Sequence, residues 1–186
     1  KEKKIKSLGL CDTSNLCGAL EFADKISKSG TQPIIGTQIN FKHAGTTGLL
    51  PLYALNENGY KKIIELSSLS YLNNDELSDP HLELEKLLNN ESDGISIFSG
   101  TIHGLFGQLF IKGKFNEIDD LYSKLKSKYN DHFYIEIQRH GDQNENSFEK
   151  FNLNKSLELE IPIIATNEVF YINKEMHEAH DALVCI

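Results

Sequence analysis

Short apolar runs alternate along this chain with longer segments of helical period, and this alternation constrains the fold more than any other feature of the sequence. The runs are bounded by polar turns, which makes them predicted strands. They cover Ile5–Leu10, Pro33–Phe41, Leu49–Leu55, Gly94–Ser99, Phe133–Gln138 and Ile161–Thr166. Strands that alternate with helices are typical of α/β proteins with a parallel sheet, so the sequence predicts that fold class.

The strongest helical pattern lies between residues 115 and 129. Its apolar residues recur at steps of three and four, which places them on one buried face of a helix that covers the sheet. They are Phe115, Ile118, Leu121, Tyr122, Leu125 and Tyr129. Similar patterns predict helices over Tyr60–Leu72 and Leu82–Leu88, with surface loops at Lys42–Gly48 and Asn73–Pro80. On this pattern alone, a closed (β/α) barrel and an open doubly wound sheet fit equally well.

The composition is that of a soluble domain. The chain has 186 residues, of which 39% are hydrophobic, enough for one domain with a full core. No apolar run approaches the roughly 20 residues of a membrane helix, and no signal-peptide core follows Lys1, so we expect a cytoplasmic protein. The formal net charge of −8 argues against a general phosphate-binding surface, so we do not expect this chain alone to bind DNA. Cys11, Cys17 and Cys185 match no metal-binding spacing and are predicted to be reduced packing residues.

Both ends of the chain resemble interruptions of longer elements. Lys1 leads into a strand without a helix start signal, and Ile186 closes within an amphipathic pattern that has no stop signal. We therefore expect residues 1–186 to be a single domain and a fragment of a longer multidomain chain.

The residues after the first predicted strand carry the most chemical information. The sequence Cys11-Asp12-Thr13-Ser14-Asn15 links that strand to a helix. An aspartate at the C-terminal end of a barrel strand is where metal-dependent hydrolases place a ligand. Thr13 and Ser14 provide no imidazole beside it, so the chain keeps the frame of a metal site without the usual ligands.

The order and spacing of several short motifs resemble the PHP domain (polymerase and histidinol phosphatase) of the alpha subunit of bacterial DNA polymerase III. The resemblance extends over nearly the whole chain. It rests on Asp12 to Phe22, Pro33-Ile34-Ile35-Gly36, Asn58-Gly59-Tyr60, Phe98-Ser99-Gly100, Phe133-Tyr134-Ile135-Glu136, Ile164-Ala165-Thr166-Asn167-Glu168-Val169 and Ala179-His180-Asp181.

Such a resemblance implies a distorted, TIM-like (β/α)7 barrel whose first strand is missing here. In the metal-binding members of the family, His, Asp, Glu and Cys side chains at the strand ends hold metal ions for phosphoester hydrolysis. Most of these positions are altered in this chain. A histidine is replaced by Thr13 and a glutamate by Gln38, and apolar residues stand where other ligands are expected. The family's upstream His-x-His pair lies outside the sequence.

The resemblance therefore implies a vestigial metal pocket with no bound metal and no catalytic residue, because neutral amides and apolar groups are weak or absent donors. Its residues are Asp12, Thr13, Gln38, Leu49, Thr101, Glu168 and Phe170. Asp12 and Glu168 would remain as a pair of carboxylates able to do acid/base chemistry. The interpretation we favour is structural: Asp12 caps a helix that begins near Leu16, and Glu168 pairs with a lysine or arginine.

The histidines offer a second set of candidate ligands. His103 and His140 lie near predicted strand ends, and His177 and His180 are three residues apart on a helix, which is ligand spacing. For each we expect a hydrogen-bonded or surface histidine rather than a metal ligand. The others, His43, His81 and His132, are predicted to lie in or beside loops.

The family resemblance implies a DNA-directed DNA polymerase, a nucleotidyltransferase whose Mg²⁺ site and DNA contacts lie downstream of this domain. The domain itself would brace the polymerase core and dock the proofreading exonuclease subunit, among other replicase subunits. Two alternatives stay open. One is an active PHP phosphoesterase or proofreading exonuclease, and the other is a stand-alone binding module.

Overall fold

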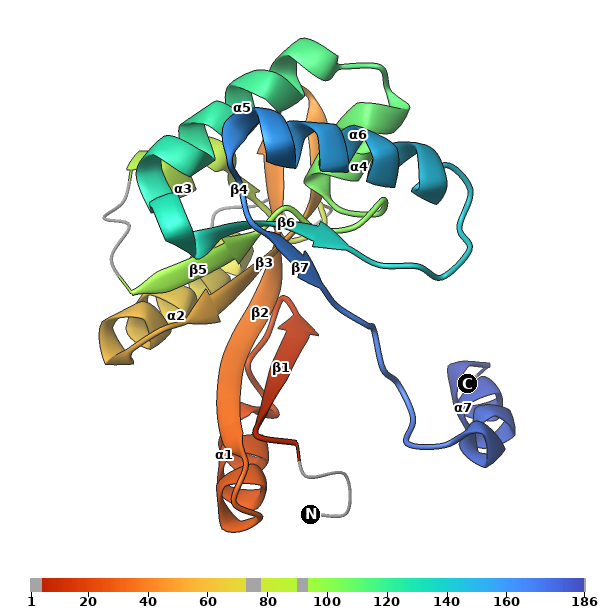
Figure 1. Ribbon diagram of the computed structural model, residues 1–186. Helices are drawn as coiled ribbons and strands as arrows, with labels where there is room; N and C mark the ends of the chain where they lie inside the picture. The colour runs from red at the N-terminus through yellow and green to blue at the C-terminus, as the bar shows by residue number, and fades with distance from the viewer. Residues whose placement is uncertain (1–4, 73–77, 90–93, 186) are drawn as a thin grey trace.

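A curled mixed sheet with helices packed against it forms the body of the molecule (Figure 1). The computed structural model describes residues 5–72, 78–89 and 94–185. The strands are β1 (Ser7–Thr13), β2 (Gln32–His43), β3 (Thr46–Ala54), β4 (Leu82–Glu83), β5 (Ile95–Phe98), β6 (Phe133–Ile137) and β7 (Ile163–Ala165). They pair in the order β1-β2-β3-β5-β6-β7, and the short β4 pairs with β2. The fold is therefore α/β, with the sheet curled into a half-barrel between β1 and β7.

The strand β3 runs against its neighbours. It pairs antiparallel with both β2 and β5, whereas the β1–β2, β5–β6 and β6–β7 pairs are parallel. The turn between β2 and β3 consists of Ala44 and Gly45, both with positive φ, which is the backbone of a tight two-residue hairpin. The predicted surface loop Lys42–Gly48 is wrong, because most of its residues belong to the two strands. The expectation of a parallel sheet is confirmed for the β1–β2, β5–β6 and β6–β7 pairs and is wrong for β3, which runs antiparallel to both of its neighbours.

The helices are α1 (Ala19–Lys28), α2 (Glu57–Leu72), α3 (Leu84–Asn89), α4 (Leu105–Ile111), α5 (Phe115–Tyr129), α6 (Glu145–Leu159) and α7 (His177–Val184). The pattern between residues 115 and 129 is confirmed as α5, and five of its six apolar residues are buried; Phe115 is 46% exposed. The helix predicted at Leu82–Leu88 is confirmed from Leu84 onward. Of the loop predicted at Asn73–Pro80, residues 73–77 lie outside the described residues.

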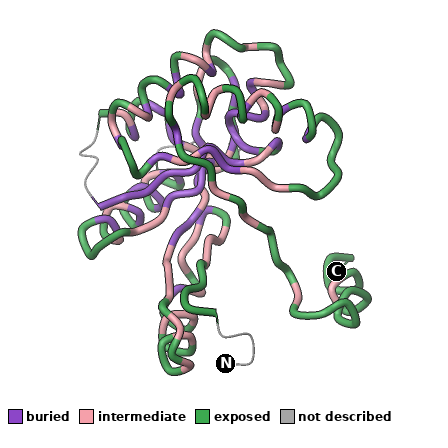
Figure 2. The backbone as a smooth tube through the Cα atoms, viewed as in Figure 1, coloured by how far each residue is buried: buried purple, intermediate pink, exposed green. Residues whose placement is uncertain are grey.

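The two faces of the sheet differ in what they contact. Leu50 and Leu52 of β3 and Phe133 and Ile135 of β6 are fully buried in the hydrophobic core with α2, α4 and α5. Because side chains alternate along a strand, the intervening residues of these strands point to the opposite face. That face lines a polar cavity. Figure 2 shows the buried backbone concentrated between the sheet and the helices α3 to α6.

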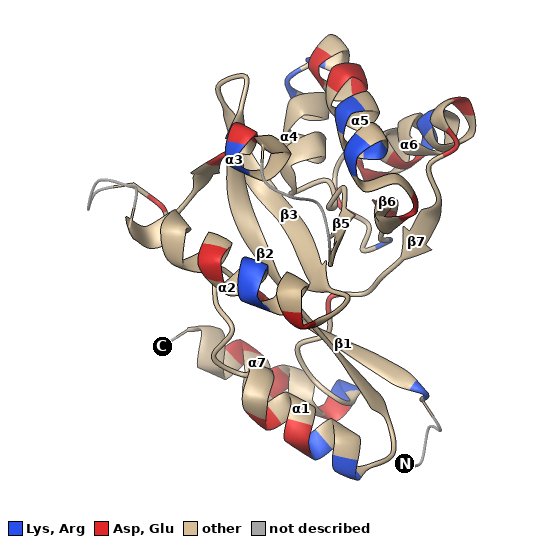
Figure 3. Ribbon diagram, turned by 90° about the vertical axis from the view of Figure 1, so that its left-hand side faces the viewer, with Lys and Arg blue, Asp and Glu red and all other residues tan. Residues whose placement is uncertain are grey.

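The C-terminal segment leaves the sheet after β7 and ends in α7, which stands apart from the helix-covered core (Figure 1). No residue of α7 is buried, and Val169, Phe170 and Ile172 of the preceding segment are exposed. Charged residues are concentrated on helices such as α1 and α5, and the strands carry few of them (Figure 3). Within the described ranges, no helix has the length and apolar character needed to span a membrane.

All three cysteines are free, as expected. Cys17 and Cys185 are exposed, so the prediction that the cysteines are packing residues is wrong for these two. Cys11 is partly buried.

Candidate functional site

The seven residues of the predicted vestigial pocket come together in the structure. Asp12, Thr13, Gln38, Leu49, Thr101, Glu168 and Phe170 all line one cavity of about 490 Å³. We call it the inner cavity. A second cavity of about 530 Å³ adjoins it and shares Thr101, Glu168 and Phe170. We call this one the outer cavity; His103, His140, Asp142 and Tyr171 also line it.

The sheet topology explains why residues far apart in sequence meet here. Asp12 and Thr13 end β1, Thr101 follows β5, and Glu168 follows β7, so all come from the carboxyl ends of strands that run the same way. The reversed strand β3 contributes Leu49 from its first half. Leu49 forms a β-bridge with Gly104, and a Cβ on Gly104 would lie 2.9 Å from the Leu49 carbonyl oxygen. The absence of a side chain at Gly104 therefore allows the loop after β5 to approach the cavity.

Hydrogen bonds join β1 to β2 at the edge of the inner cavity. Gln38 Nε2 donates to Thr13 Oγ1 over 2.8 Å, and Thr37 Oγ1 donates to the Asp12 carbonyl over 2.6 Å. The two residues that replace a histidine and a glutamate thus bind each other. This pair holds the strand ends together with neutral groups.

The prediction that Asp12 caps a helix near Leu16 is wrong. The helix α1 begins at Ala19 with Gly18 as its N-cap and no side-chain cap bond. Asn15 is the reason, because its Oδ1 accepts a hydrogen bond from Cys17 N and its Nδ2 donates to Thr13 O, which makes a local turn before the helix. Asp12 Oδ2 nonetheless lies near this start, 3.3 Å from where a Cβ on Gly18 would be.

Glu136 is a residue of the inner cavity that the sequence did not single out as a candidate site residue. It lies on β6, lines the inner cavity and is only 4% exposed. Its Oε1 accepts hydrogen bonds from Thr166 Oγ1 and, at 3.4 Å, from Gln138 Nε2, while its Oε2 has no hydrogen-bond partner among the described residues. Burial raises the pKa of Glu136, and the interactions with Thr166, Gln138 and the backbone N–H of Gly100 offset part of that rise. An acidic residue at a cavity-facing position of the apolar run Phe133–Ile137 was the signal that could have revealed it.

The predicted cation partner of Glu168 is not observed. Within residues 5–72, 78–89 and 94–185, no ion pair involves Glu168, whose side chain is exposed at the cavity. The negative charge of Glu168 instead acts on Glu136, another carboxylate, and raises the pKa of Glu136. The prediction of a lysine or arginine partner is therefore wrong for the described chain.

Two further titratable groups line the inner cavity beside Glu136. Burial raises the pKa of Cys11 to about 12, and burial also raises the pKa of Tyr53. The negative charge of Glu136 adds to both shifts. The cavity thus disfavours additional negative charge, and the Cys11 thiol stays protonated at neutral pH.

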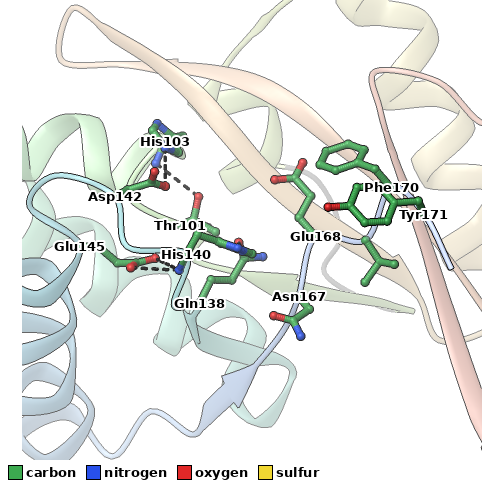
Figure 4. A pocket seen from close by; sticks show the side chains of 11 residues that line it. Thr101, His103, Gln138, His140, Asp142, Glu145, Asn167, Glu168, Phe170 and Tyr171 are labelled. Atoms are coloured by element: carbon green, nitrogen blue, oxygen red, sulfur yellow. Dashed lines mark hydrogen bonds and ion pairs between the residues drawn. The ribbon is translucent and has the colours of Figure 1, made fainter. Parts of the chain in front are cut away.

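The outer cavity is built around a histidine and an aspartate (Figure 4). His103 Nε2 lies 2.9 Å from Asp142 Oδ2, and His103 N donates to Thr101 Oγ1 over 3.3 Å. Figure 4 shows Glu168, Phe170 and Tyr171 on the other side of this cavity. The loop that carries Asp142 is held by Glu145, which accepts hydrogen bonds from the backbone N–H groups of His140 and Gly141.

The remaining histidines have ordinary contacts. His140 Nε2 lies 3.0 Å from Gln138 Oε1, and the rings of His177 and His180 lie beside the Tyr171 ring, at centroid distances of 5.8 and 5.6 Å. His81 Nδ1 lies 2.8 Å from the Asp79 carbonyl oxygen. These contacts agree with hydrogen-bonded and surface histidines.

Comparison with known proteins identifies the family. The sequence matches the family described as "PHP domain" over residues 1–140. The chain belongs to the PHP domain family. A solved structure provisionally described as a metal-dependent phosphoesterase of Bifidobacterium adolescentis covers 88% of this PHP chain at 9% identity and a TM-score of 0.44, a likeness too low to support any inference.

Three curated relatives of this PHP domain are each described as "DNA polymerase III subunit alpha". The relative from Caulobacter vibrioides is 35% identical over 193 aligned residues and matches 100% of this chain. Those from Rickettsia bellii and Vibrio cholerae are 34% and 31% identical over 98% and 99% of the chain. The chain spans only 17%, 16% and 16% of the length of these three relatives.

The inner cavity does not fit the metal cluster that the PHP family implies. A metal site needs several His, Cys, Asp or Glu donors that converge within about 2.0 to 2.6 Å of one point. Among the residues that the structure describes, no three such side chains are grouped to hold a metal ion. Gln38, Leu49 and Phe170 occupy the cavity wall instead. We therefore derive no chemical step through a metal.

Proposed function

We propose that this chain is the PHP domain of a bacterial DNA polymerase III alpha subunit. In this proposal, residues 1–186 form a single domain, and the intact cytoplasmic protein is a DNA-directed DNA polymerase with a Mg²⁺ site in downstream domains. The observation that carries the proposal is the alignment of 98% or more of the chain with alpha subunits from three genera. Substrate DNA would be bound by those downstream domains, because this domain has a net charge of −8.

The domain's own role in this proposal is structural and independent of metal. It braces the polymerase core and provides a docking surface for the proofreading exonuclease subunit and other replicase subunits. The composition of the inner cavity supports this role, because the Thr13–Gln38 hydrogen bond and the side chains of Leu49 and Phe170 replace charged donors. Neutral contacts at these positions avoid the repulsion that further carboxylates would add to those of Asp12, Glu136 and Glu168.

We further propose that one additional strand of the intact protein completes a distorted (β/α)7 barrel. β1 and β7 are the two ends of the sheet order, and both line the inner cavity through residues at or just after their carboxyl ends. An uncovered strand edge exposes unpaired backbone N–H and C=O groups, which a further strand would satisfy. A strand inserted between them would close the cavity on its open side.

The test begins with the coding DNA on both sides of the fragment and continues with the full-length gene product. We expect a downstream frame of several hundred codons, primer-extension activity, and substoichiometric zinc, manganese and iron in the purified protein. Primer extension should be unaffected by Asp12→Ala, because Asp12 is assigned no catalytic role. An early stop codon or lack of primer extension would contradict the polymerase assignment.

The phosphoesterase or proofreading alternative makes the opposite prediction for the same samples. It requires stoichiometric metal, hydrolysis of a phosphodiester or of a 3′ DNA end, and loss of that hydrolysis in Asp12→Ala. Thr13→Ala serves as the matched control, because it removes a neighbouring cavity group without changing charge. Metal together with Asp12-dependent hydrolysis would replace the structural role with a catalytic one.

A further inference from the structure

Acidic side chains outnumber basic ones in the lining of the inner cavity. Asp12, Glu136 and Glu168 all line it, and its lining includes no lysine or arginine among the described residues. Arg139 is paired with Glu149 at 2.7 Å and does not line this cavity. His103 is the histidine of the described lining, and its Nε2 lies 2.9 Å from Asp142 Oδ2, so the three carboxylates of the inner cavity have no lysine or arginine beside them.

The side chain of Glu136 has an unsatisfied hydrogen-bond acceptor at this cavity. It is 4% exposed, and its Oε2 has no partner among the described residues, although Oε1 has two donors. Glu136 and both side chains that donate to its Oε1, Thr166 and Gln138, line the inner cavity. The carboxylate therefore faces this cavity, where a buried unsatisfied acceptor costs free energy until a donor reaches it.

The chemistry of the wall selects the class of ligand. An anion is excluded by three carboxylates, and a metal ion is disfavoured because the described donors are not grouped for one. A cationic group with N–H donors fits, because carboxylates bind guanidinium and ammonium groups by charge-assisted hydrogen bonds. The volume of about 490 Å³ is that of a small-ligand pocket.

We propose that the inner cavity binds an organic cation with N–H donors, a guanidinium or primary ammonium group, anchored by Glu136. The cation has two possible sources with this chemistry: a free small molecule, or an arginine or lysine side chain from the rest of the intact protein. The proposal rests on the cavity itself and holds whether or not the protein is a polymerase.

A competing partner for Glu136 lies on its other side. Glu136 and Asn152 also line a separate cavity of about 10 Å³, and Asn152 Nδ2 is likewise buried without a partner among the described residues. That volume holds at most about one water molecule. A water that bridges Asn152 Nδ2 and Glu136 Oε2 would satisfy both atoms without any ligand in the inner cavity.

The test uses the full-length gene product and calorimetric titration with methylguanidinium. Tetramethylammonium is the control ligand, because it has the same charge and no N–H donor. Glu136→Gln preserves the shape of the side chain and should weaken methylguanidinium binding by about tenfold or more. Glu83→Gln is the matched control variant, because it removes an exposed carboxylate of β4 outside both cavities, and it should leave the affinity unchanged.

A crystal or cryo-EM structure of the same full-length protein distinguishes the two sources. Binding of methylguanidinium with the expected selectivity supports a free cation. Absence of binding, together with an arginine or lysine nitrogen within hydrogen-bond distance of Glu136 Oε2, supports the side-chain source. The proposal is overturned if Glu136 Oε2 contacts only a water shared with Asn152, if a metal ion occupies the cavity, or if tetramethylammonium binds as tightly as methylguanidinium.

Discussion

The two faces of one sheet show how differently neighbouring residues of the same strand can be used. On β6, Phe133 and Ile135 are fully buried against the helices, whereas Glu136 faces the inner cavity with an unpaired oxygen. On β3, Leu50 and Leu52 belong to the core, and Leu49 and Tyr53 line the cavity. The helix-covered face therefore accounts for stability through close packing, and the cavity face retains polar groups that packing alone does not explain.

The strongest test of this contrast is a truncation on the helix-covered face. Phe106 is fully buried, and its ring stacks on Tyr122 at a centroid distance of 4.3 Å. Phe106→Ala should lower the free energy of unfolding by about 3 to 5 kcal/mol, measured by urea denaturation. Phe115→Ala, at a ring that is 46% exposed, is the matched control and should cost clearly less. Equal losses in the two variants would show that the helix-covered face is not the better packed one.

A change on the cavity face should have the opposite sign. In amine-free buffer at neutral pH, Glu136→Gln should raise the free energy of unfolding of this chain by about 1 to 3 kcal/mol, because a buried carboxylate oxygen without a partner is costly. Urea is the suitable denaturant, since guanidinium is itself a candidate ligand. If Glu136→Gln instead lowers the stability of the full-length protein relative to wild type, a cationic group of that protein binds Glu136 in the folded state.

The pH dependence gives an independent measure of the same group. The pKa of Glu136 is raised above 4.5 in the folded chain, so between 4.5 and the raised value the folded state binds more protons than the unfolded state. The stability of the wild type should therefore fall as pH rises through this window, relative to Glu136→Gln. If the free energies of unfolding of the two proteins, measured with urea, change by the same amount with pH across that window, the raised pKa of Glu136 is contradicted.

A buried hydrogen bond on the helix-covered face should have a smaller effect. Tyr122 Oη donates to Asn152 Oδ1 over 2.8 Å and joins α5 to α6. Tyr122→Phe should lower the free energy of unfolding by about 1 kcal/mol, because it removes the bond and keeps the ring. The control is Tyr71→Phe at an exposed position, where we expect no measurable change.

The smallest effect is expected on the outer surface of the same helices. Lys124 Nζ lies 2.6 Å from Asp120 Oδ2, one helical turn away, and both side chains are about half exposed. Asp120→Asn should cost no more than about 0.5 kcal/mol, and the cost should shrink in high salt. A larger, salt-independent loss would mean that this face of α5 contributes packing that its exposure does not indicate.

Sequence patterns predicted the helix-covered face well and the cavity face only in part. The apolar period of residues 115–129 is enough to fix α5 and its buried face, because nothing else satisfies that spacing. The reversal of β3 was not predicted, because the hairpin turn at Ala44 and Gly45 lacks the Asn-Gly or Asp-Gly pair that usually marks it.

The residues that line the inner cavity were likewise predicted only in part. Family motifs predicted seven residues that meet in one cavity; Asp12 and Thr13 end a strand, whereas Gln38 and Leu49 lie within strands. They could not supply Glu136, whose importance depends on burial and on a missing partner, or the Asn15 turn that displaces the start of α1. Both are tertiary or local backbone properties that a motif does not encode.

The two-residue hairpin between β2 and β3 has a consequence for the order of folding. Its strands pair residue by residue from His43 and Thr46 outward, so the first contacts join positions close in the chain. Forming such a hairpin takes on the order of microseconds. The strands β3 and β5 are separated in the chain by α2, β4 and α3, so their pairing closes a much longer loop and is slower. We therefore expect the reversed strand to seed the sheet, with β1 and β7 joining last. The walls of the inner cavity would then assemble at the end of folding, around a centre that is already formed.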